Sequence, residues 1–497
     1  MNKKWLVSLA LSSFIFMAGV ISITVYVDPF FVYHAPLEEM SYQYLNEAYQ
    51  VPGIARNFQY DQIITGSSMT ENFSTDLLTS LFNADNTVKL CYSGASLRNE
   101  AEILQTALAT ENQKIKRVFM SLDLWTFTND YKEISNQSPE FLMDGTMIND
   151  AGYLLNKDVL LENIIPVLQR SVKGTPSQDM DSAFRWYGLA YGDYAILNQW
   201  SPPSYEGIPE QNPFDQYMPD AIDNVEYNLR PVIEKYPEVD FYMFFPPYSI
   251  LYWYEQSPDL EAILKVREYV SSELMEYDNV FLYDFQSESR MILNLWNYKD
   301  TQHYNPKIND FIANCFASGE YKVSAPDDIQ KNNSDIRNML SKWRLKDIRQ
   351  DYLWSKKEII DYTDVFFEDD YKIYIVVKTD SSWNWSEDMV NCWKKLGSRY
   401  NLNENHDSSY YAVIEHGQIQ TEALDTKPLV YEENNIRLTS SASWNYDACI
   451  QIDGVEYSQN SRGLNIVVYD KKQGKVVDSV AFDTCGDGAA ERMNRWQ

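Results

Sequence analysis

The chain has 497 residues, and 42 Lys and Arg against 72 Asp and Glu give it a net charge of −30. So acidic a surface repels phosphate backbones and anionic headgroups, which excludes nucleic acid as an expected partner. Hydrophobic residues make up 44% of the chain, so it is not a disordered protein. Its length predicts roughly three structural units, at ~150 residues each.

The five cysteines form no CxxC pair and no Cys/His cluster with zinc spacing. We therefore expect no metal site, and no motif implies an organic cofactor. Cys449 and Cys485 either pair with each other or remain buried thiols, and the sequence leaves both alternatives open.

An uncharged stretch, Trp5–Val27, follows Lys3 and Lys4 and is long enough to span a bilayer as a helix. No further Lys or Arg occurs before Arg56, so the positive-inside rule places the N-terminus in the cytoplasm. A cleaved signal peptide is the alternative, but no A-x-A site follows the stretch. We predict a cytoplasmic tip and transmembrane anchor over 1–27, with the main domains extracytoplasmic and attached to the cell membrane by this single span.

After a juxtamembrane segment over 28–59, strand-length apolar runs alternate with helical patterns. The expected strands are Tyr60–Thr65, Val88–Tyr92, Arg117–Leu122, Val239–Phe245 and Val280–Asp284. The expected helices are Ser68–Phe82, Leu97–Glu111 and Leu260–Glu276. This alternation predicts a parallel sheet covered on both faces, and hence a three-layer α/β domain over 60–320.

Two further regions differ in texture. The Pro-rich segment Asn198–Pro219 is an insertion, either a lid or a plain surface excursion. Beyond a linker over 321–360, with a helix around Ile336–Leu353, we expect a smaller α+β domain over 361–497. Its expected elements are a helix over Trp385–Leu396 and strands over Tyr371–Val377, Tyr410–Ile414, Ala448–Ile452, Leu464–Tyr469 and Lys475–Phe482.

A glycine and two serines follow the first expected strand, as Gly66-Ser67-Ser68. A serine that opens a helix lies where backbone N–H groups and the helix dipole favour an alkoxide or oxyanion. Gly66 permits the tight turn that such a position requires. Helix capping is the alternative explanation for the serine.

One of only four histidines occurs in Asp300-Thr301-Gln302-His303. The spacing lets the Asp300 carboxylate accept a hydrogen bond from Nδ1 of His303 and leaves Nε2 free to take a proton from a serine. A capping aspartate beside an incidental histidine is the alternative. We predict Ser68, His303 and Asp300 as a catalytic set, which requires Ser68 Oγ within ~2.6–3.2 Å of His303 Nε2.

Two more strand ends carry polar or turn residues, Gly94 after the second strand and Asp123 after the third. Ligands of open α/β sheets bind at the carboxyl ends of the strands, so both residues belong to the same edge as Ser68. The backbone N–H of Gly94 is a candidate oxyanion donor, unless this is an ordinary strand–helix turn. We therefore assign Gly94, Ser67 and Asp123 to the oxyanion site or pocket.

Over residues 60–310 the chain resembles the SGNH, or GDSL-type, hydrolase superfamily. The Gly66–Ser68 turn matches its first motif with Ser68 as nucleophile, Gly94 matches the second, and Asp300, His303 and the trailing Tyr304 match the last. The resemblance implies acyl-ester chemistry. With its N-terminal anchor, the chain is similar to envelope proteins that D-alanylate teichoic acids or O-acetylate polysaccharides.

The chain departs from that family at two positions. Ser67 replaces the usual Asp of the first motif, and Asp123 stands where the third motif, Gly-x-Asn, has its Asn. An Asn amide donates to the oxyanion, whereas an ionised Asp cannot. Either Asp123 is protonated, or it has another role, or the oxyanion site uses two donors.

The C-terminal region resembles the ILEI/PANDER domain. The resemblance rests on Ile452–Tyr457, Arg462–Asp470 and Gly474–Asp478, with Tyr371–Gly417 as the other half in permuted order. It implies carbohydrate binding in some members, which makes Arg462 and Asn465 candidate glycan contacts, with turn and strand-edge structure as the alternative. Tyr248 and Trp253 are candidates for a sugar-stacking wall, or else for core packing.

These observations predict a membrane-anchored extracytoplasmic serine esterase or O-acyltransferase. Its expected partner is a cell-surface polysaccharide or a teichoic-acid-like glycopolymer, with a membrane-bound O-acyltransferase as a second candidate partner. The alternative is a non-catalytic glycan-binding or assembly protein on a degenerate hydrolase scaffold. A third alternative is signalling or adhesion through the C-terminal domain alone.

Overall fold

The computed structural model begins with one long helix, α1 (Lys3–Val27). It is long and apolar enough to cross a membrane, with a hydropathy of 2.3 over a window that lies outside the protein core. The structure describes residues 3–110, 114–135, 142, 146, 149–186, 189, 191–192, 196, 200–201, 203–205, 208–343, 356, 358–378, 385–405, 407–442, 448–472, 474–484 and 492–493.

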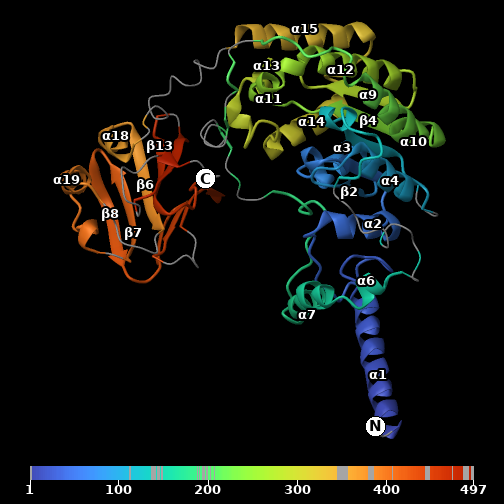
Figure 1. The fold of residues 1–497 in the computed structure, drawn as a ribbon, viewed down its shortest axis with the longest axis horizontal. Coiled ribbons are helices and arrows are strands. Elements are labelled where there is room, and N and C mark those ends of the chain that lie inside the picture. Colours follow the sequence, from blue (N-terminus) through green and yellow to red (C-terminus); the bar gives the residue numbers. More distant parts are fainter. Residues whose placement is uncertain are drawn as a thin grey trace.

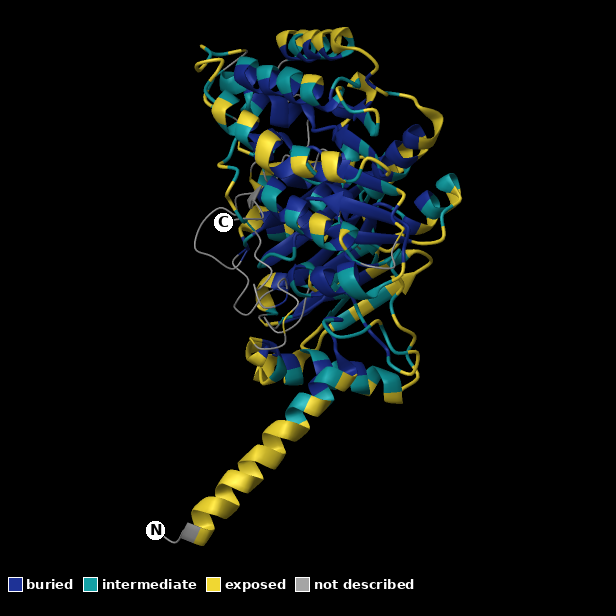
Figure 2. Ribbon diagram, turned by 90° about the vertical axis from the view of Figure 1, so that its right-hand side faces the viewer, coloured by how far each residue is buried: buried dark blue, intermediate teal, exposed yellow. Residues whose placement is uncertain are grey.

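A five-stranded parallel sheet forms the centre of the part that follows, with strand order β2-β1-β3-β4-β5. Consecutive residues along these strands are buried, which means that both faces of the sheet are covered. Figure 1 and Figure 2 show helices on either side of it. The strands are β1 (Gln62–Gly66), β2 (Thr87–Cys91), β3 (Arg117–Ser121), β4 (Asp240–Phe245) and β5 (Val280–Asp284).

Several helices of this part begin at polar caps. Ser96 caps α4 in a reciprocal capping box with Asn99, and Asn305 caps α14 in front of Pro306. The helical segments are α2 (Glu47–Asn57), η1 (Ser68–Thr70), α3 (Thr75–Phe82), α4 (Leu97–Leu108), η2 (Leu124–Phe127), α6 (Ala151–Leu154), η3 (Val159–Ile164), α7 (Ile165–Val172), α9 (Met218–Asn224), η4 (Val225–Leu229), α10 (Arg230–Lys235), α11 (Ile250–Glu255), η5 (Ser257–Asp259), α12 (Leu260–Leu274), α13 (Ser289–Ile292), η6 (Leu295–Asn297), α14 (Pro306–Ser318) and α15 (Pro326–Lys342).

The C-terminal part contains two antiparallel sheets with their own apolar clusters. One sheet has the order β15-β14-β13-β6-β7-β8 and the other β12-β11-β10-β9. Their elements are α18 (Ile359–Tyr362), η7 (Thr363–Phe367), β6 (Tyr371–Lys378), α19 (Glu387–Lys395), η8 (Leu402–Glu404), β7 (Ser409–Glu415), β8 (Gln418–Asp425), β9 (Leu429–Glu433), β10 (Ile436–Ser440), β11 (Cys449–Ile452), β12 (Val455–Glu456), β13 (Gly463–Asp470), β14 (Lys475–Phe482) and β15 (Arg492–Met493).

The mixed α/β class and the parallel sheet are confirmed, and several expected boundaries are wrong. The helix expected over Ser68–Phe82 is two segments, because Ser74 interrupts the chain with non-helical dihedrals and caps α3. The helix expected around Ile336–Leu353 begins earlier, where Pro326 occupies a first-turn position. Strands β8, β9 and β10 were not predicted, because polar residues on their solvent-facing sides interrupt the apolar runs by which a strand is recognised. Cys485, and with it the predicted pairing, lies outside the described residues.

Candidate functional site

Ser68 lies in the turn that leaves the carboxyl end of β1. Every residue from Tyr60 to Phe73 is buried except Ser68, so this side chain alone reaches the surface there. Gly66 has a φ of +134°, and a Cβ on it would lie 2.3 Å from Ser121 Oγ. The turn therefore demands glycine twice, for its conformation and for its close approach to β3.

Ser68, His303 and Asp300 lie in one hydrogen-bonded line. Ser68 Oγ is 2.8 Å from His303 Nε2, and His303 Nδ1 is 2.7 Å from Asp300 Oδ2. A carboxylate only accepts, so Nδ1 carries the hydrogen and Nε2 presents its lone pair to Ser68. The structure thus brings together the three residues predicted as catalytic, at a distance within the range that proton transfer requires.

The Asp300 carboxylate is kept ionised by its surroundings. Burial raises its pKa, but hydrogen bonds from the His303 ring and from the backbone N–H groups of His303 and Gln302 outweigh burial and lower the pKa to about 2. The two backbone bonds also fix the carboxylate's orientation. Asp300 can therefore hold the imidazole in one tautomer and stabilise an imidazolium.

The loop of His303 is tied to the turn of Ser68 through one carbonyl. Tyr304 Oη donates to Met69 O at 3.3 Å, and Asn309 Nδ2 donates to the same oxygen at 2.9 Å. Both donors are buried. These bonds set the spacing between the serine and the histidine, although the two residues are 235 positions apart in the chain.

Two backbone N–H groups at this sheet edge are available as donors. Within the residues described, the amides of Ser68 and Gly94 make no hydrogen bond to the protein. Gly94 has a φ of +67° and follows β2, the neighbour of β1 in the sheet. Free amides at strand ends are the groups from which oxyanion sites are built, so the geometry permits the predicted pair of donors.

Asp123 is buried and is an acceptor for three hydroxyl groups. Its Oδ2 accepts from Ser67 at 2.7 Å and from Ser121 at 2.8 Å, and its Oδ1 accepts from Tyr248 at 2.5 Å. Ser67 Oγ in turn accepts from the N–H of Met69 at 3.3 Å. Asp123 therefore stabilises the turn of Ser67 and Ser68 through these hydrogen bonds. This role differs from the oxyanion contact expected of an Asn at this position.

Glu71 and Trp186 lie beside the histidine and were missed by the sequence analysis. The Trp186 ring packs edge-on to His303 with centroids 5.0 Å apart, and its Nε1 donates to Glu71 Oε2 at 2.5 Å. Ser93, next to Gly94, donates to the other oxygen of Glu71 at 2.8 Å. Burial first, and then the charge of Glu47, raise the pKa of Glu71 to about 7. In the sequence, the position of Glu71 shortly after Ser68 is the only signal that could have indicated a place near the site.

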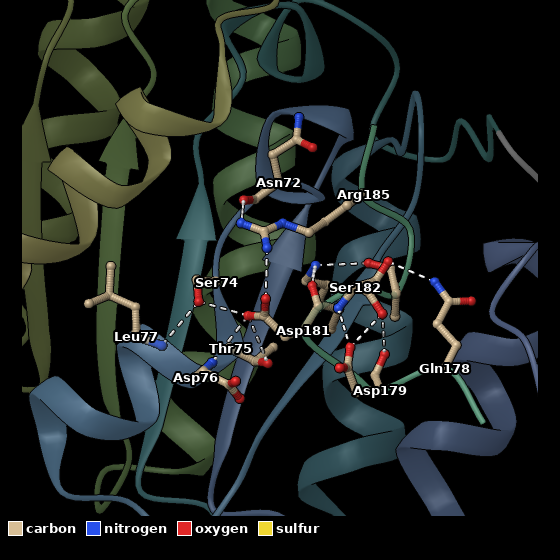
Figure 3. A network of polar contacts seen from close by, with 12 residues as sticks. Asn72, Ser74, Thr75, Asp76, Leu77, Gln178, Asp179, Asp181, Ser182 and Arg185 are labelled. Carbon is tan, nitrogen blue, oxygen red and sulfur yellow. Dashed lines mark hydrogen bonds and ion pairs between the residues drawn. The ribbon is translucent and has the colours of Figure 1, made fainter. Parts of the chain in front are cut away.

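A polar network joins Asp181 and Arg185, just before Trp186 in the chain, to the residues around Asn72 and Ser74 (Figure 3). Asp181 accepts from Ser74, the cap of α3, at 2.7 Å and pairs with Arg185 at 2.7 Å. Arg185 also reaches Asn72 O at 3.4 Å, and the Asn72 side chain accepts from the N–H of Trp186 at 3.0 Å. The segment is therefore held against the chain that follows the nucleophile.

Three of the four predicted glycan contacts, Tyr248, Trp253 and Asn465, are buried. Tyr248 and Trp253 are buried at 1% and 0% exposure, because they pack in the core behind the sheet edge. Asn465 is buried and bonds to the backbone of Ser461. Arg462 forms a salt bridge with Asp483. The alternatives of core packing and local structure fit these residues.

No family model and no curated protein matches this chain. Among solved structures the chain is similar to one described as a candidate platelet activating factor from Streptococcus pneumonia. The two share 12% sequence identity over 55% of this chain and 90% of that chain, with a TM-score of 0.29. At this TM-score the likeness supports no conclusion about the site.

Proposed function

We propose that the protein is a membrane-anchored serine esterase or O-acyltransferase acting on acyl esters of a cell-surface glycan or glycopolymer. The observation that carries the proposal is the line from Ser68 Oγ through His303 to Asp300, at 2.8 and 2.7 Å. The partial exposure of Ser68 on an otherwise buried turn adds support, because a nucleophile must meet its substrate.

In the proposed reaction Ser68 Oγ attacks the acyl carbon while its proton passes to His303 Nε2. Asp300 stabilises the imidazolium, and the N–H groups of Ser68 and Gly94 receive the oxyanion. The imidazolium then protonates the leaving alkoxide, and an acyl ester remains on Ser68. A sugar hydroxyl or water, deprotonated by His303, releases the acyl group and restores the serine.

The support for the glycan acceptor and for the outward orientation comes from the sequence. Lys3 and Lys4 at the start of α1, with the next basic residue at Arg56, favour a cytoplasmic N-terminus. The resemblance to SGNH envelope proteins supplies the substrate class and the membrane-bound O-acyltransferase as a candidate partner. The alternative function, a non-catalytic scaffold, was motivated by Asp123. The three hydroxyl groups that donate to the Asp123 carboxylate give this residue a structural role, which is compatible with catalysis.

The test is covalent labelling of the full-length chain in detergent micelles with a fluorophosphonate. Wild type should label at one serine, Ser68→Ala should lose labelling, and Ser74→Ala should retain it, since Ser74 caps α3 outside the hydrogen-bonded line. Turnover of an acetyl ester, with and without added oligosaccharide acceptors, separates hydrolysis from transfer. Unchanged labelling of Ser68→Ala would overturn the proposed nucleophile.

A further inference from the structure

The unpacked length of α1 is too short for a bilayer. Residues 5–19 are apolar or uncharged and make no burying contact with the rest of the protein, whereas packing against it begins at Val20 and Ile21. At ~1.5 Å per residue these fifteen residues extend about 22 Å. The hydrocarbon core of a bilayer is ~30 Å thick. About 8 Å of the hydrocarbon core therefore lies at the level where α1 packs against the rest of the protein.

At this level α1 contacts α6 and η3, and α7 continues the helix that η3 begins (Figure 1). Thr24 Oγ1 contacts Leu154 O at 3.3 Å, and Tyr153 donates to Asp28, the residue after α1, at 2.7 Å. Helical structure is continuous from Lys157 to Val172. The hydrogen bonds hold α6 at the end of α1, and η3, the first part of the helix that follows α6, also contacts α1.

This helix has more apolar surface than the protein covers. Its inner face buries Val159, Ile164 and Val167. A second apolar stripe recurs at intervals of four, three and four residues, which places its members on one side of a helix. The stripe consists of Leu161, Ile165, Leu168 and Val172. Leu161 is 55% and Val172 is 89% exposed, whereas Ile165 and Leu168 are half-buried and Leu168 packs partly against the core.

We propose that η3 and α7 lie in the outer interface of the membrane, with the stripe of Leu161, Ile165, Leu168 and Val172 in the lipid. Interfacial helices bury their apolar face by roughly 5–10 Å, which matches the missing length of α1. The exposed Lys157 and Lys173 at the two ends are placed for contact with headgroups. The inference rests on the proposed membrane span of α1, and it sets the height of the catalytic site above the bilayer.

The experiment uses the full-length chain in proteoliposomes, with single cysteines introduced at Leu161 and Val172 and labelled with an environment-sensitive fluorophore. Native cysteines that react are replaced by serine. Matched controls are Gln169→Cys, on the polar side of the same helix, and Val430→Cys, an apolar site of the C-terminal part that is 56% exposed. We expect blue-shifted emission, and at least threefold stronger quenching by doxyl-labelled lipid, at 161 and 172 than at either control.

Quenching at 161 and 172 no stronger than at 430 would overturn the inference. A second outcome would also overturn the inference: labels at 161 and 172 that become less solvent-exposed as the protein-to-lipid ratio rises, but are not quenched by doxyl lipid. A second copy of the chain, rather than lipid, would then cover the stripe. Flotation of the same samples separates the two proposals. Chains that float with vesicles but show solvent-like labels refute only the interfacial helix, whereas chains that do not float refute the span of α1.

Discussion

Ser67 donates its hydroxyl hydrogen to Asp123 over 2.7 Å, and this bond joins the end of β1 to the end of β3. The donor is therefore on one strand end and the carboxylate on the other. A carboxylate at position 67 with an amide at position 123 would exchange these two roles and keep a donor–acceptor pair between the same strand ends.

This exchange of roles can be tested with two variants. Ser67→Asp alone would place two buried carboxylates in contact, and we expect it to lower the free energy of unfolding by several kcal/mol. The double variant Ser67→Asp with Asp123→Asn should recover at least ~1 kcal/mol of that loss, because a carboxylate again faces a donor. Chemical denaturation of the four chains measures the coupling. Additive effects would contradict the exchange.

Asp123→Asn alone should destabilise the fold while leaving the serine reactive. A neutral amide offers one acceptor oxygen to three hydroxyl donors, so we expect a loss of about 1–3 kcal/mol. Ser121→Ala removes one of the three bonds and should cost less, about 1 kcal/mol. Fluorophosphonate labelling of the folded fraction should stay within tenfold of wild type. A loss of labelling without a loss of stability would instead place Asp123 in the reaction.

The sequence predicted the parallel sheet and the three residues of the hydrogen-bonded line because their signals are local. Buried strands are short apolar runs, and Asp300 and His303 lie within one turn of each other. The hydrogen bonds to Asp123 could not be predicted, because their donors come from three different strand ends. Trp186 was missed for the same reason, since only the folded chain brings it to His303. For Tyr248 and Trp253 the choice between a sugar-stacking wall and core packing stayed open, because the sequence does not reveal which side chains after β4 are covered.

Gly66→Ala should damage the site more than Gly94→Ala does. A Cβ at position 66 would lie 2.3 Å from Ser121 Oγ on a backbone with a φ of +134°, whereas a Cβ at position 94 meets no atom within 4 Å. Gly94→Ala then carries only the cost of a left-handed residue, ~1–2 kcal/mol. We expect Gly66→Ala to lose more than that, together with fluorophosphonate labelling. Thermal unfolding and labelling rates distinguish the two, and equal losses would contradict the packing argument.

Asp300→Asn should slow the reaction without unfolding the chain. An Asn amide that donates to Nδ1 leaves the hydrogen on Nε2, where it cannot accept the proton of Ser68. We expect the rate of fluorophosphonate labelling to fall by ~10²–10⁴-fold, the usual contribution of general-base catalysis. Asp310→Asn is the matched control, since Asp310 lies outside the line. A labelling rate within threefold of wild type would show that Asp300 does not set the histidine tautomer.

Glu71→Gln should stabilise the protein increasingly as the pH rises. The folded chain holds the Glu71 proton up to a pKa of about 7, against an ordinary value of 4.5. Between these values the folded state binds more protons than the unfolded state, so wild type loses stability as the pH rises, by at most about 3 kcal/mol. Glutamine removes this loss and can still accept the hydrogen bond of Trp186.

The pH dependence of Glu71→Gln has an internal control of opposite sign. Hydrogen bonds from Arg290, opposed by burial and aided by Tyr321, lower the pKa of Glu288 to about 2. Its contribution is present above pH 4.5 and is lost as the pH falls towards 2, so Glu288→Gln should be less stable than wild type at neutral pH. Between pH 5 and pH 8, urea unfolding should show a rise in the stability of Glu71→Gln relative to wild type. The relative stability of Glu288→Gln should stay constant over this range, because Glu288 titrates below it. If the stability of Glu71→Gln relative to wild type is the same at the two pH values, Glu71 does not hold its proton beside the site.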